Sequence, residues 1–275
     1  MITIHPLFWF VVATGILTGH FWKLMLLFMI VTCHELGHYM MARHFSWRIR
    51  KLTLLPFGGV MEVDEHGNQP MIEEALVTVA GPVQHIWMIA LSFGMGSLFS
   101  WWLSFHELFV ILNLMLLGFN LLPIWPLDGG KLLFLILGRG RSYKRAHRLL
   151  IISSLMFLIV FLSVSLYMEG FHLNLLFIIT FLLMAHYTEW KHHPYVQLRF
   201  ALERYTKWKA LTLKKTKTLS IKETMTLDDV LKLLGKGVQH RFLVNDQLIG
   251  EQDVLQQYFG EKKAGYTVGD VFCIN

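Results

Sequence analysis

The sequence has 275 residues, of which 54% are hydrophobic and 16% are charged, and its formal net charge is +6. A composition this apolar excludes an ordinary water-soluble globular domain, and the length leaves room for several membrane spans and a small soluble domain. The two cysteines, Cys33 and Cys273, do not support a disulfide framework. We therefore expect an integral membrane protein whose soluble part faces a reducing compartment.

Six apolar stretches are long enough to cross a bilayer. The first follows no basic segment and no clear cleavage site, so we interpret it as a retained span and not as a signal peptide. Basic residues gather in 43–51 and 139–148, and the positive-inside rule then places these segments and both chain termini in the cytoplasm. A nucleic-acid site is the alternative explanation of these charges, but basic clusters beside anionic headgroups need no nucleic acid. The predicted spans are residues 6–22, 24–43, 75–100, 106–123, 148–168 and 171–190.

The second span carries His34-Glu35-Leu36-Gly37-His38 in its middle. Residues i and i+4 lie on the same face of a helix, so both imidazoles can reach one metal ion with Glu35 beside them. This spacing is the zinc-protease signature, and ionisable residues at membrane depth indicate a functional site by default. The alternative is a chance match whose histidines bond to neighbouring helices, but a buried Glu35 would then need another partner.

Residues 52–63 are apolar but too short to cross a bilayer, and Pro56, Gly58 and Gly59 argue against a helix. We expect a strand or a re-entrant hairpin beside an internal site, because non-helical backbone at membrane depth must be covered by protein or by a water-filled cavity. An interfacial loop on the surface is the alternative. The edge of such a strand could hold an extended substrate.

The third span contains Ala80-Gly81-Pro82 and then His85. Glycine and proline in a span permit close helix approach and a local break, so this segment forms either a packing notch or part of a cavity wall. We favour packing. His85 could be a third metal ligand by residue type, but a lone histidine in a span more often hydrogen-bonds to a neighbouring helix.

The chain after the fourth span is broken by two prolines, and Asp128 lies two residues beyond the second of them, Pro126. Two histidines leave a zinc ion short of ligands, because catalytic sites use three protein ligands and an open position for water. We choose Asp128 as the third ligand. A turn aspartate that caps the following helix is the alternative. Asn120, close to this turn, could hold substrate or orient Asp128.

Residues 191–217 are charged and aromatic, and we expect them to begin as an amphipathic cytoplasmic helix on the membrane surface. A plain solvated basic helix explains them equally well. From Thr218 the pattern becomes that of a small α/β unit, in which Thr226 caps a helix and two short strands flank a turn at Asn245-Asp246. The predicted domains are a six-span membrane domain at 1–190, a linker at 191–217 and a cytoplasmic domain at 218–275.

These motifs resemble the site-two protease family of intramembrane zinc metalloproteases, and the resemblance covers essentially the whole chain. Within that family the chain looks like the branch that processes the precursor of a sporulation sigma factor, sigma K. The resemblance implies one Zn²⁺ per chain, bound by His34, His38 and Asp128, with Glu35 as the catalytic base. It rests on the segment His34 to His38, on Phe57-Gly58-Gly59, on Ala80-Gly81-Pro82, on Asn120 and on Pro126 to Gly130.

The same resemblance implies partners. They are the membrane-associated sigma-factor precursor as substrate, the lipid bilayer, and membrane proteins as inhibitors, with no direct contact to nucleic acid. The implied location is the forespore outer membrane facing the mother cell. The implied substrate-binding residues are Phe57, Gly58, Gly59, Asn120 and Pro126.

The C-terminal unit is similar to a single cystathionine-β-synthase (CBS) domain. Such a domain is half of the usual pair, so we expect it to pair with another copy, which would make the protein a homo-oligomer. ATP binding there is a hypothesis that depends on Asp253. The nucleotide-binding pattern of these domains has a hydroxyl residue three positions before this aspartate, and here Gly250 stands at that position.

The reaction expected from this set of residues is the hydrolysis of a peptide bond. Water bound to zinc becomes acidic enough to lose a proton near neutral pH, and Glu35 takes that proton. A metal-binding membrane transporter or sensor is the alternative, and Glu35 separates the two, because a protease needs it and a transport site does not. A catalytically silent scaffold regulated through the C-terminal unit is the third interpretation.

Overall fold

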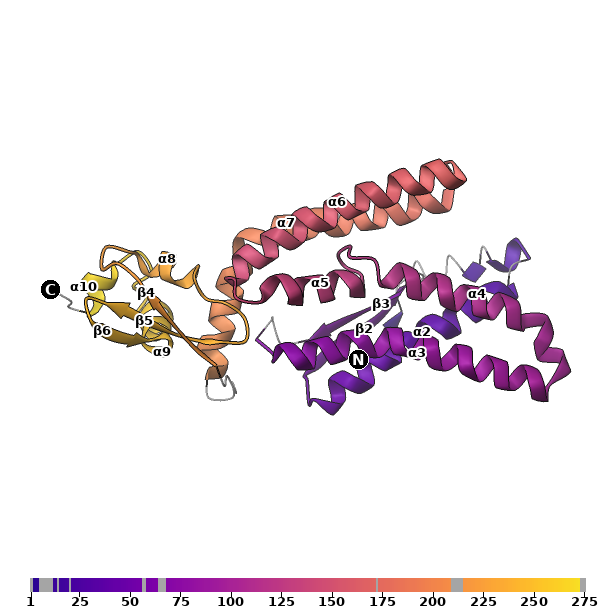
Figure 1. Ribbon diagram of the computed structural model, residues 1–275, viewed down its shortest axis with the longest axis horizontal. Coiled ribbons are helices and arrows are strands. Elements are labelled where there is room, and N and C mark those ends of the chain that lie inside the picture. The colour runs from indigo at the N-terminus through magenta and orange to yellow at the C-terminus, as the bar shows by residue number, and fades with distance from the viewer. Residues whose placement is uncertain are drawn as a thin grey trace. The chain divides into compact units, whose positions relative to one another are not determined.

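The computed structural model describes residues 2–4, 12–13, 15–19, 21–55, 58–63, 68–171, 173–208 and 215–272 (Figure 1). The chain divides into two compact units. Unit 1 contains residues 1–64, 72–123 and 127–132, and unit 2 contains residues 65–71, 124–126 and 133–275.

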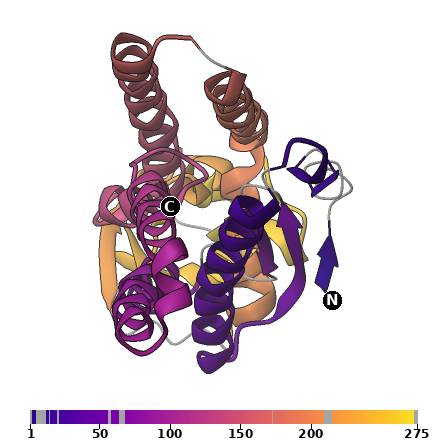
Figure 2. The ribbon, with the colours of Figure 1, turned by 90° about the vertical axis from the view of Figure 1, so that its right-hand side faces the viewer.

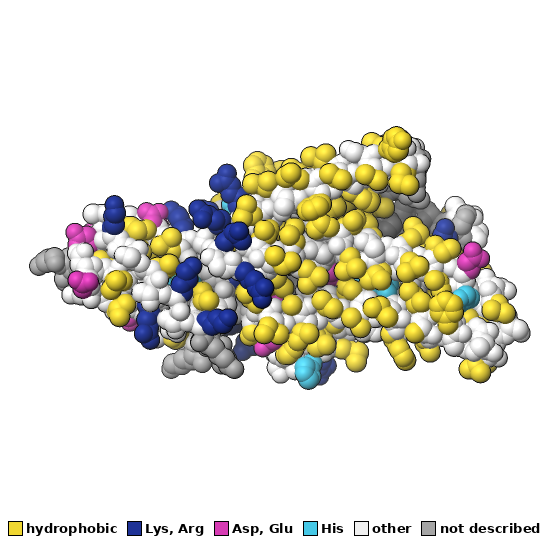
Figure 3. All heavy atoms as spheres, viewed as in Figure 1, with side chains coloured by type: hydrophobic (Ala, Val, Ile, Leu, Met, Phe, Trp, Pro, Cys, Tyr) yellow, Lys and Arg dark blue, Asp and Glu magenta, His cyan; other side chains and the backbone are white. Residues whose placement is uncertain are grey.

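The chain is mostly helical, and four helical segments among the described residues are long and apolar enough to cross a membrane. Large apolar side chains on these helices are exposed, among them Trp87, Met115 and Met156. The space-filling view shows the same property as a largely hydrophobic surface over α4 and α6 (Figure 3). Apolar surface of this extent fits a hydrocarbon solvent. The four segments are α2 (Phe21–His44), α3 (Met71–Leu98), η1 (Ser100–Trp102) with α4 (Leu103–Asn120), and α6 (Tyr143–Glu169).

Four of the six predicted spans overlap these helices. The first predicted span, residues 6–22, is described only in part, because residues 6–11, 14 and 20 lie outside the described residues. The last, residues 171–190, falls on α7 (Leu173–Lys207), which continues well beyond the predicted end of the span. The chain is therefore a helical membrane protein with four candidate spans, and the architecture of six spans stays a prediction.

A small apolar core holds α2, α3 and α4 together in unit 1. Ile30 of α2, Met88 of α3 and Phe109 of α4 are buried there, next to Trp102. The Trp102 indole donates to Ser92 Oγ at 3.0 Å, so the one polar atom of this large side chain has a partner.

A β-hairpin connects α2 with α3. Its strands are β2 (Ile49–Leu55) and β3 (Gly58–Val63), which pair antiparallel. β1 (Ile2–Ile4) pairs in parallel with β2, so the strand order is β1-β2-β3. The strand predicted within residues 52–63 is confirmed. On the far edge of β3, no strand pairs with it among the residues that the structure describes.

Unit 2 begins its helical part with the end of α5 (Asp128–Gly138), followed by a hairpin of α6 and α7. Both ribbon views show α6 and α7 running antiparallel along each other (Figure 1; Figure 2). Between them, Ser154 Oγ lies 2.7 Å from His186 Nε2. Ser154 Oγ also accepts a hydrogen bond from the backbone N–H of Trp125 at 2.6 Å.

A small three-stranded sheet with short helices forms the C-terminal part of unit 2. Its middle strand pairs in parallel with β4 and antiparallel with β6. The predicted turn at Asn245-Asp246 is confirmed, and both residues have positive φ angles, 42° and 66°, as a tight hairpin turn requires. Thr226 caps α8 as predicted, because its side chain accepts from Asp229 N at 3.3 Å. The elements are β4 (Thr216–Ser220), α8 (Leu227–Leu231), β5 (Gln239–Val244), β6 (Gln247–Gly250), α9 (Glu251–Leu255), η3 (Gln256–Gly260) and α10 (Val268–Phe272).

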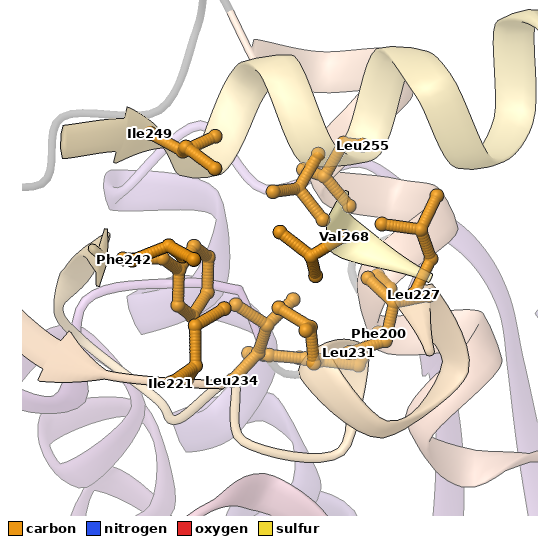
Figure 4. Close-up of a cluster of buried hydrophobic side chains, with 13 residues drawn as sticks. Phe200, Ile221, Leu227, Leu231, Leu234, Phe242, Ile249, Leu255 and Val268 are labelled. Carbon is orange, nitrogen blue, oxygen red and sulfur yellow. The ribbon is translucent and has the colours of Figure 1, made fainter. Parts of the chain in front are cut away.

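The last turns of α7 help to build the apolar core of this part. Phe200 and Ala201 are fully buried there among residues of the sheet and the short helices, including Phe242 and Leu234 (Figure 4). Tyr143, the first residue of α6, stacks on Phe200 with the ring centroids 4.3 Å apart. The helix expected from residue 191 is thus the end of α7, in which Phe200 and Ala201 are covered by protein while Tyr195, Leu198 and Leu202 are exposed.

Candidate metal centre

Three buried side chains from two elements of unit 1 meet at one point. His34 and His38 lie one turn apart on α2, and their Nε2 atoms are 3.0 Å apart. Asp128 Oδ2, at the start of α5, lies 3.1 Å from each of the two nitrogens. Among the described histidine, cysteine and acidic residues, these three have ligand atoms that lie close enough together to hold one metal ion.

Local structure directs one oxygen of Asp128 toward the histidines. Lys131, one turn further along α5, donates to Asp128 Oδ1 at 2.9 Å, which leaves Oδ2 to face the imidazoles. The next residue, Gly129, packs against the end of α4, where a Cβ atom would overlap the carbonyl oxygen of Leu121. A glycine is therefore required for the turn that presents the aspartate.

The hydrogen bonds around His38 define its free nitrogen. Its Nδ1 lies 2.8 Å from the backbone carbonyl oxygen of Val77, which can only accept a hydrogen bond. Nδ1 therefore carries the hydrogen in the neutral imidazole, and the lone pair is on Nε2, which faces His34 and Asp128. A lone pair on nitrogen beside a carboxylate oxygen is a repulsive arrangement that a cation relieves.

The three ligand atoms fit zinc in type and in spacing. Zn²⁺ binds imidazole nitrogen and carboxylate oxygen, and a tetrahedral ion with bonds of about 2.0–2.1 Å keeps its ligand atoms about 3.3 Å apart. The observed separations of 3.0–3.1 Å are close to that value. Three protein ligands also leave one position for water, which is the pattern of catalytic zinc sites and not of structural ones.

Glu35 is buried, with 8% of its surface exposed, and follows His34 directly on α2. The carboxylate of Glu35 and the ammonium group of Lys131 attract each other electrostatically. A carboxylate next to a metal ligand can act as a general base toward metal-bound water.

The other predicted site residues have more scattered positions. Asn120 is the last residue of α4 and is half-buried, on the same unit as the three ligands. Gly58 and Gly59 open β3, whereas Phe57 lies outside the described residues. Pro126 belongs to unit 2.

Asp253 lies in the C-terminal part of unit 2, near the start of α9. Its Oδ2 accepts from Gly250 N at 3.2 Å, so the carboxylate caps this helix.

Gly81 lies directly against the two ligand histidines. A Cβ atom on Gly81 would overlap His38 Nε2 and lie 2.8 Å from His34 Cε1. The Ala80-Gly81-Pro82 segment of α3 therefore forms a wall of the site as well as a packing contact, and our preference for packing alone was too narrow. On α2, Gly37 serves the same close approach, because a Cβ atom there would overlap Ala80 O.

The sequence interpretation preferred a hydrogen bond to a neighbouring helix over a ligand role for His85, and it overlooked Asn113. His85 Nε2 lies 3.0 Å from His34 Nδ1, and His85 Nδ1 lies 3.1 Å from Asn113 Oδ1. The expectation that His85 bonds to a neighbouring helix is confirmed. Its presence three residues after Pro82, on the face of α3 that Gly81 opens toward α2, was the available signal.

Comparison with known proteins supports the chemistry of this site. The profile of peptidase family M50 matches residues 22–102 and 88–164. The chain is 37% identical to stage IV sporulation protein FB of Bacillus subtilis over 98% of its own length and 95% of that protein. It is also 34% identical to a zinc metalloprotease of Methanocaldococcus jannaschii, over 47% of this chain and 39% of the relative. Among solved structures it resembles the site-2 protease from Methanocaldococcus jannaschii, with a TM-score of 0.54 and 27% identity over 68% of this chain and 90% of that one.

Proposed function

This chain belongs to peptidase family M50, and on that basis we propose that it cleaves a membrane-associated precursor of a sporulation sigma factor, the precursor of sigma K. Membership of a peptidase family makes it a membrane zinc metalloprotease and argues against a metal transporter or sensor. The substrate proposal is supported by similarity to a sporulation protein over nearly the whole length of both chains.

The proposal for the site rests on one observation, the meeting of His34, His38 and Asp128 in a triangle with edges of 3.0–3.1 Å. These three side chains would hold one Zn²⁺, which supplies Lewis acidity and a water molecule of lowered pKa. Glu35 would take a proton from that water and return it to the leaving amine. Lys131 keeps Asp128 Oδ1 occupied, so that Oδ2 alone would hold the ion.

Substrate binding is proposed at the outer edge of β3, with which no described strand pairs. The peptide bond of a helical substrate is protected by its own hydrogen bonds, so the cleaved segment must be extended, and an open strand edge binds extended chains. The implied contacts are Gly58 and Gly59 at the start of β3 and Phe57, which precedes them in the sequence, with Asn120 and Pro126 near the ligand-bearing turn. Cysteines placed from Phe57 to Val60 should then crosslink to the substrate near its cleaved bond. Crosslinks confined to the C-terminal domain would overturn this part of the proposal.

The finer architecture is proposed as six spans at 1–190 with both termini in the cytoplasm, a linker at 191–217 and a CBS-like domain at 218–275. The apolar first part of α7 and the α/β character of the sheet with α8 to α10 support it. The proposed location is the forespore outer membrane, where membrane proteins would inhibit the enzyme.

The CBS-like domain would pair with a second copy and either bind ATP through Asp253 or dock the soluble part of the substrate. ATP would have to replace the helix-capping hydrogen bond that Asp253 makes. Cleavage across an ATP titration, with Asp253→Ala in parallel, separates the two roles: an ATP response that the variant loses supports sensing, and unchanged cleavage supports docking.

Co-expression of the full-length chain with candidate sigma-factor precursors tests the proposed function. We expect wild type to cleave, and Glu35→Gln to fail with about one zinc per chain retained. Asp128→Asn should lose both zinc and cleavage. Full zinc content and activity in Asp128→Asn would overturn the ligand set, and zinc retention without cleavage of any precursor would overturn the substrate.

A further inference from the structure

A chain of buried hydrogen bonds runs away from the metal centre through three helices. It starts at His34 Nδ1 on α2, passes His85 on α3 at 3.0 Å, and reaches Asn113 Oδ1 on α4 at 3.1 Å. The Asn113 amide nitrogen then donates to the backbone carbonyl of Phe109 at 2.8 Å. His85 and Asn113 are both 0% exposed, so water does not compete for these contacts.

The direction of every bond in this chain follows from its last member. A backbone carbonyl can only accept, so the NH₂ group of Asn113 faces Phe109 and its Oδ1 faces His85. An amide oxygen also only accepts, so His85 Nδ1 carries a hydrogen. In a neutral imidazole with its hydrogen on Nδ1, the lone pair lies on Nε2, so His85 Nε2 is the acceptor toward His34.

The consequence reaches the metal centre. Since His85 Nε2 accepts, His34 Nδ1 must be the donor, and the lone pair of His34 lies on Nε2, the atom beside Asp128 Oδ2 and His38 Nε2. We propose that His85 and Asn113 are positioning residues that fix the tautomer and ring orientation of His34 for zinc binding. This inference rests on the proposed ligand set.

The two ligand histidines are therefore oriented by different means. His38 is held by a backbone carbonyl, that of Val77, which no side-chain substitution removes. His34 is held by two side chains from two other helices, so its orientation depends on how α3 and α4 pack. The arrangement also excludes His85 as a ligand of the same ion, because its Nε2 is bonded to His34 Nδ1, on a different edge of the ring from the metal-facing Nε2.

Removal of the acceptor tests the proposal. His85→Leu leaves His34 Nδ1 without a partner, and loss of such a supporting hydrogen bond typically lowers metal affinity about 10–100-fold. His85→Gln retains an amide oxygen that can accept from His34, so it should lose much less affinity. Asn113→Leu should fall between the two, because His85 remains but its tautomer is no longer fixed.

The measurement is the zinc dissociation constant of purified full-length protein, determined by competition with a chromophoric chelator, together with the visible spectrum of the Co²⁺-substituted protein. Ser92→Ala is the matched control, since Ser92 is an equally buried polar residue of α3 that bonds to Trp102. Excess zinc should restore cleavage in His85→Leu, which a purely structural defect would not permit.

Two results would overturn the inference: wild-type zinc affinity in folded His85→Leu, or equal losses of affinity in His85→Leu and Ser92→Ala. Failure of the ligand set is distinguishable, because Asp128→Asn would then keep its zinc. In that case the result for His85 would concern a different ion site.

Discussion

Two buried polar networks in this protein have opposite balances of donors and acceptors. In unit 2, the Arg204 guanidinium, 1% exposed, donates to Glu251 Oε1 at 2.6 Å, to Asn68 Oδ1 at 2.9 Å and to two backbone carbonyls. The second oxygen of Glu251 accepts from the backbone and the ring of His240 at 2.7 and 3.1 Å. Each charge has an opposite partner, and each acceptor has a donor.

In unit 1 the metal centre has the reverse property. The Nε2 atoms of His34 and His38 and the Oδ2 of Asp128 are three acceptors within 3.1 Å of one another. A network that is complete without a ligand stabilises the fold, whereas an excess of buried acceptors requires a cation. The difference predicts that the two networks respond oppositely to substitution, chelation and acid.

The largest effect is expected for the chemistry of the metal centre. Glu35→Gln removes the proposed base while its amide keeps nearly the same volume, so cleavage should fall about 10²–10⁴-fold. Zinc content and thermal stability should stay at the wild-type level. The assay is cleavage of a co-expressed precursor, with metal analysis of the purified chain.

Glu107→Gln is the control for this prediction, because Glu107 is an exposed residue near the start of α4. Equal losses in the two variants, or loss of zinc in Glu35→Gln, would contradict the separation of catalysis from metal binding.

Disruption of the network of unit 2 should lower the stability of the C-terminal part, while the metal centre of unit 1 should keep its zinc. Arg204→Leu leaves Glu251 charged and buried without its partner, which costs about 3–5 kcal/mol for a buried pair. Arg204 also packs over the ring of Phe200, with Cζ 4.6 Å from the centroid, so the apolar core loses a contact. Hydrogen exchange in β4, β5 and β6 of the full-length protein should accelerate.

Arg241→Leu serves as the comparison, since Arg241 is exposed on β5. If the two arginine variants exchanged at the same rate, the network would not support the C-terminal fold.

Close packing against the metal ligands gives a prediction on α3. Gly81→Ala places a methyl group on the Nε2 atom of His38, so the ring must move. A displacement of about 1 Å in a catalytic site can cost roughly 10²-fold in rate. Gly94→Ala is the control on the same helix, because no atom lies within 4 Å of a Cβ there. Zinc affinity and cleavage should fall only in the first variant.

Local patterns in the sequence predicted the parts of the fold that depend on local geometry. The spacing of His34 and His38 placed both on one helical face, and Thr226 and the turn at Asn245-Asp246 are signals of the same local kind. Asp128 was predicted as the third ligand, because a catalytic zinc site uses three protein ligands and the helix supplies two. Its meeting with α2, 90 residues earlier, is a fact of the structure.

The contacts that the sequence did not predict depend on packing between distant segments. Asn68 and Arg204 are 136 residues apart, and Arg204 looked like one more charge in a basic surface helix. His85 and Asn113 are ordinary polar residues in two spans, and only the packing of α3 against α4 makes one the partner of the other. Composition could not show whether a buried polar residue supports the fold or a ligand.

The smallest effect is expected from mild acid, which should separate the two networks without any substitution. Burial raises the pKa of Glu251, but the hydrogen bond from His240 and the charge of Arg204 outweigh it and hold that pKa below its ordinary value. A carboxylate with a lowered pKa contributes stability above its ordinary pKa of about 4.3 and loses it as the pH falls through the lower, folded value.

Zinc binding depends on pH for a different reason, because imidazole ligands must be unprotonated to bind the metal ion. Acidification from about pH 7.5 to about 5 should therefore release zinc while the C-terminal part stays folded. Released zinc is measured with a chromophoric chelator, and hydrogen exchange in β5 reports folding in the same samples. Unfolding of β5 at the pH where zinc leaves would mean that the two networks are one cooperative system, and the contrast between a complete network and one that needs a cation would fail.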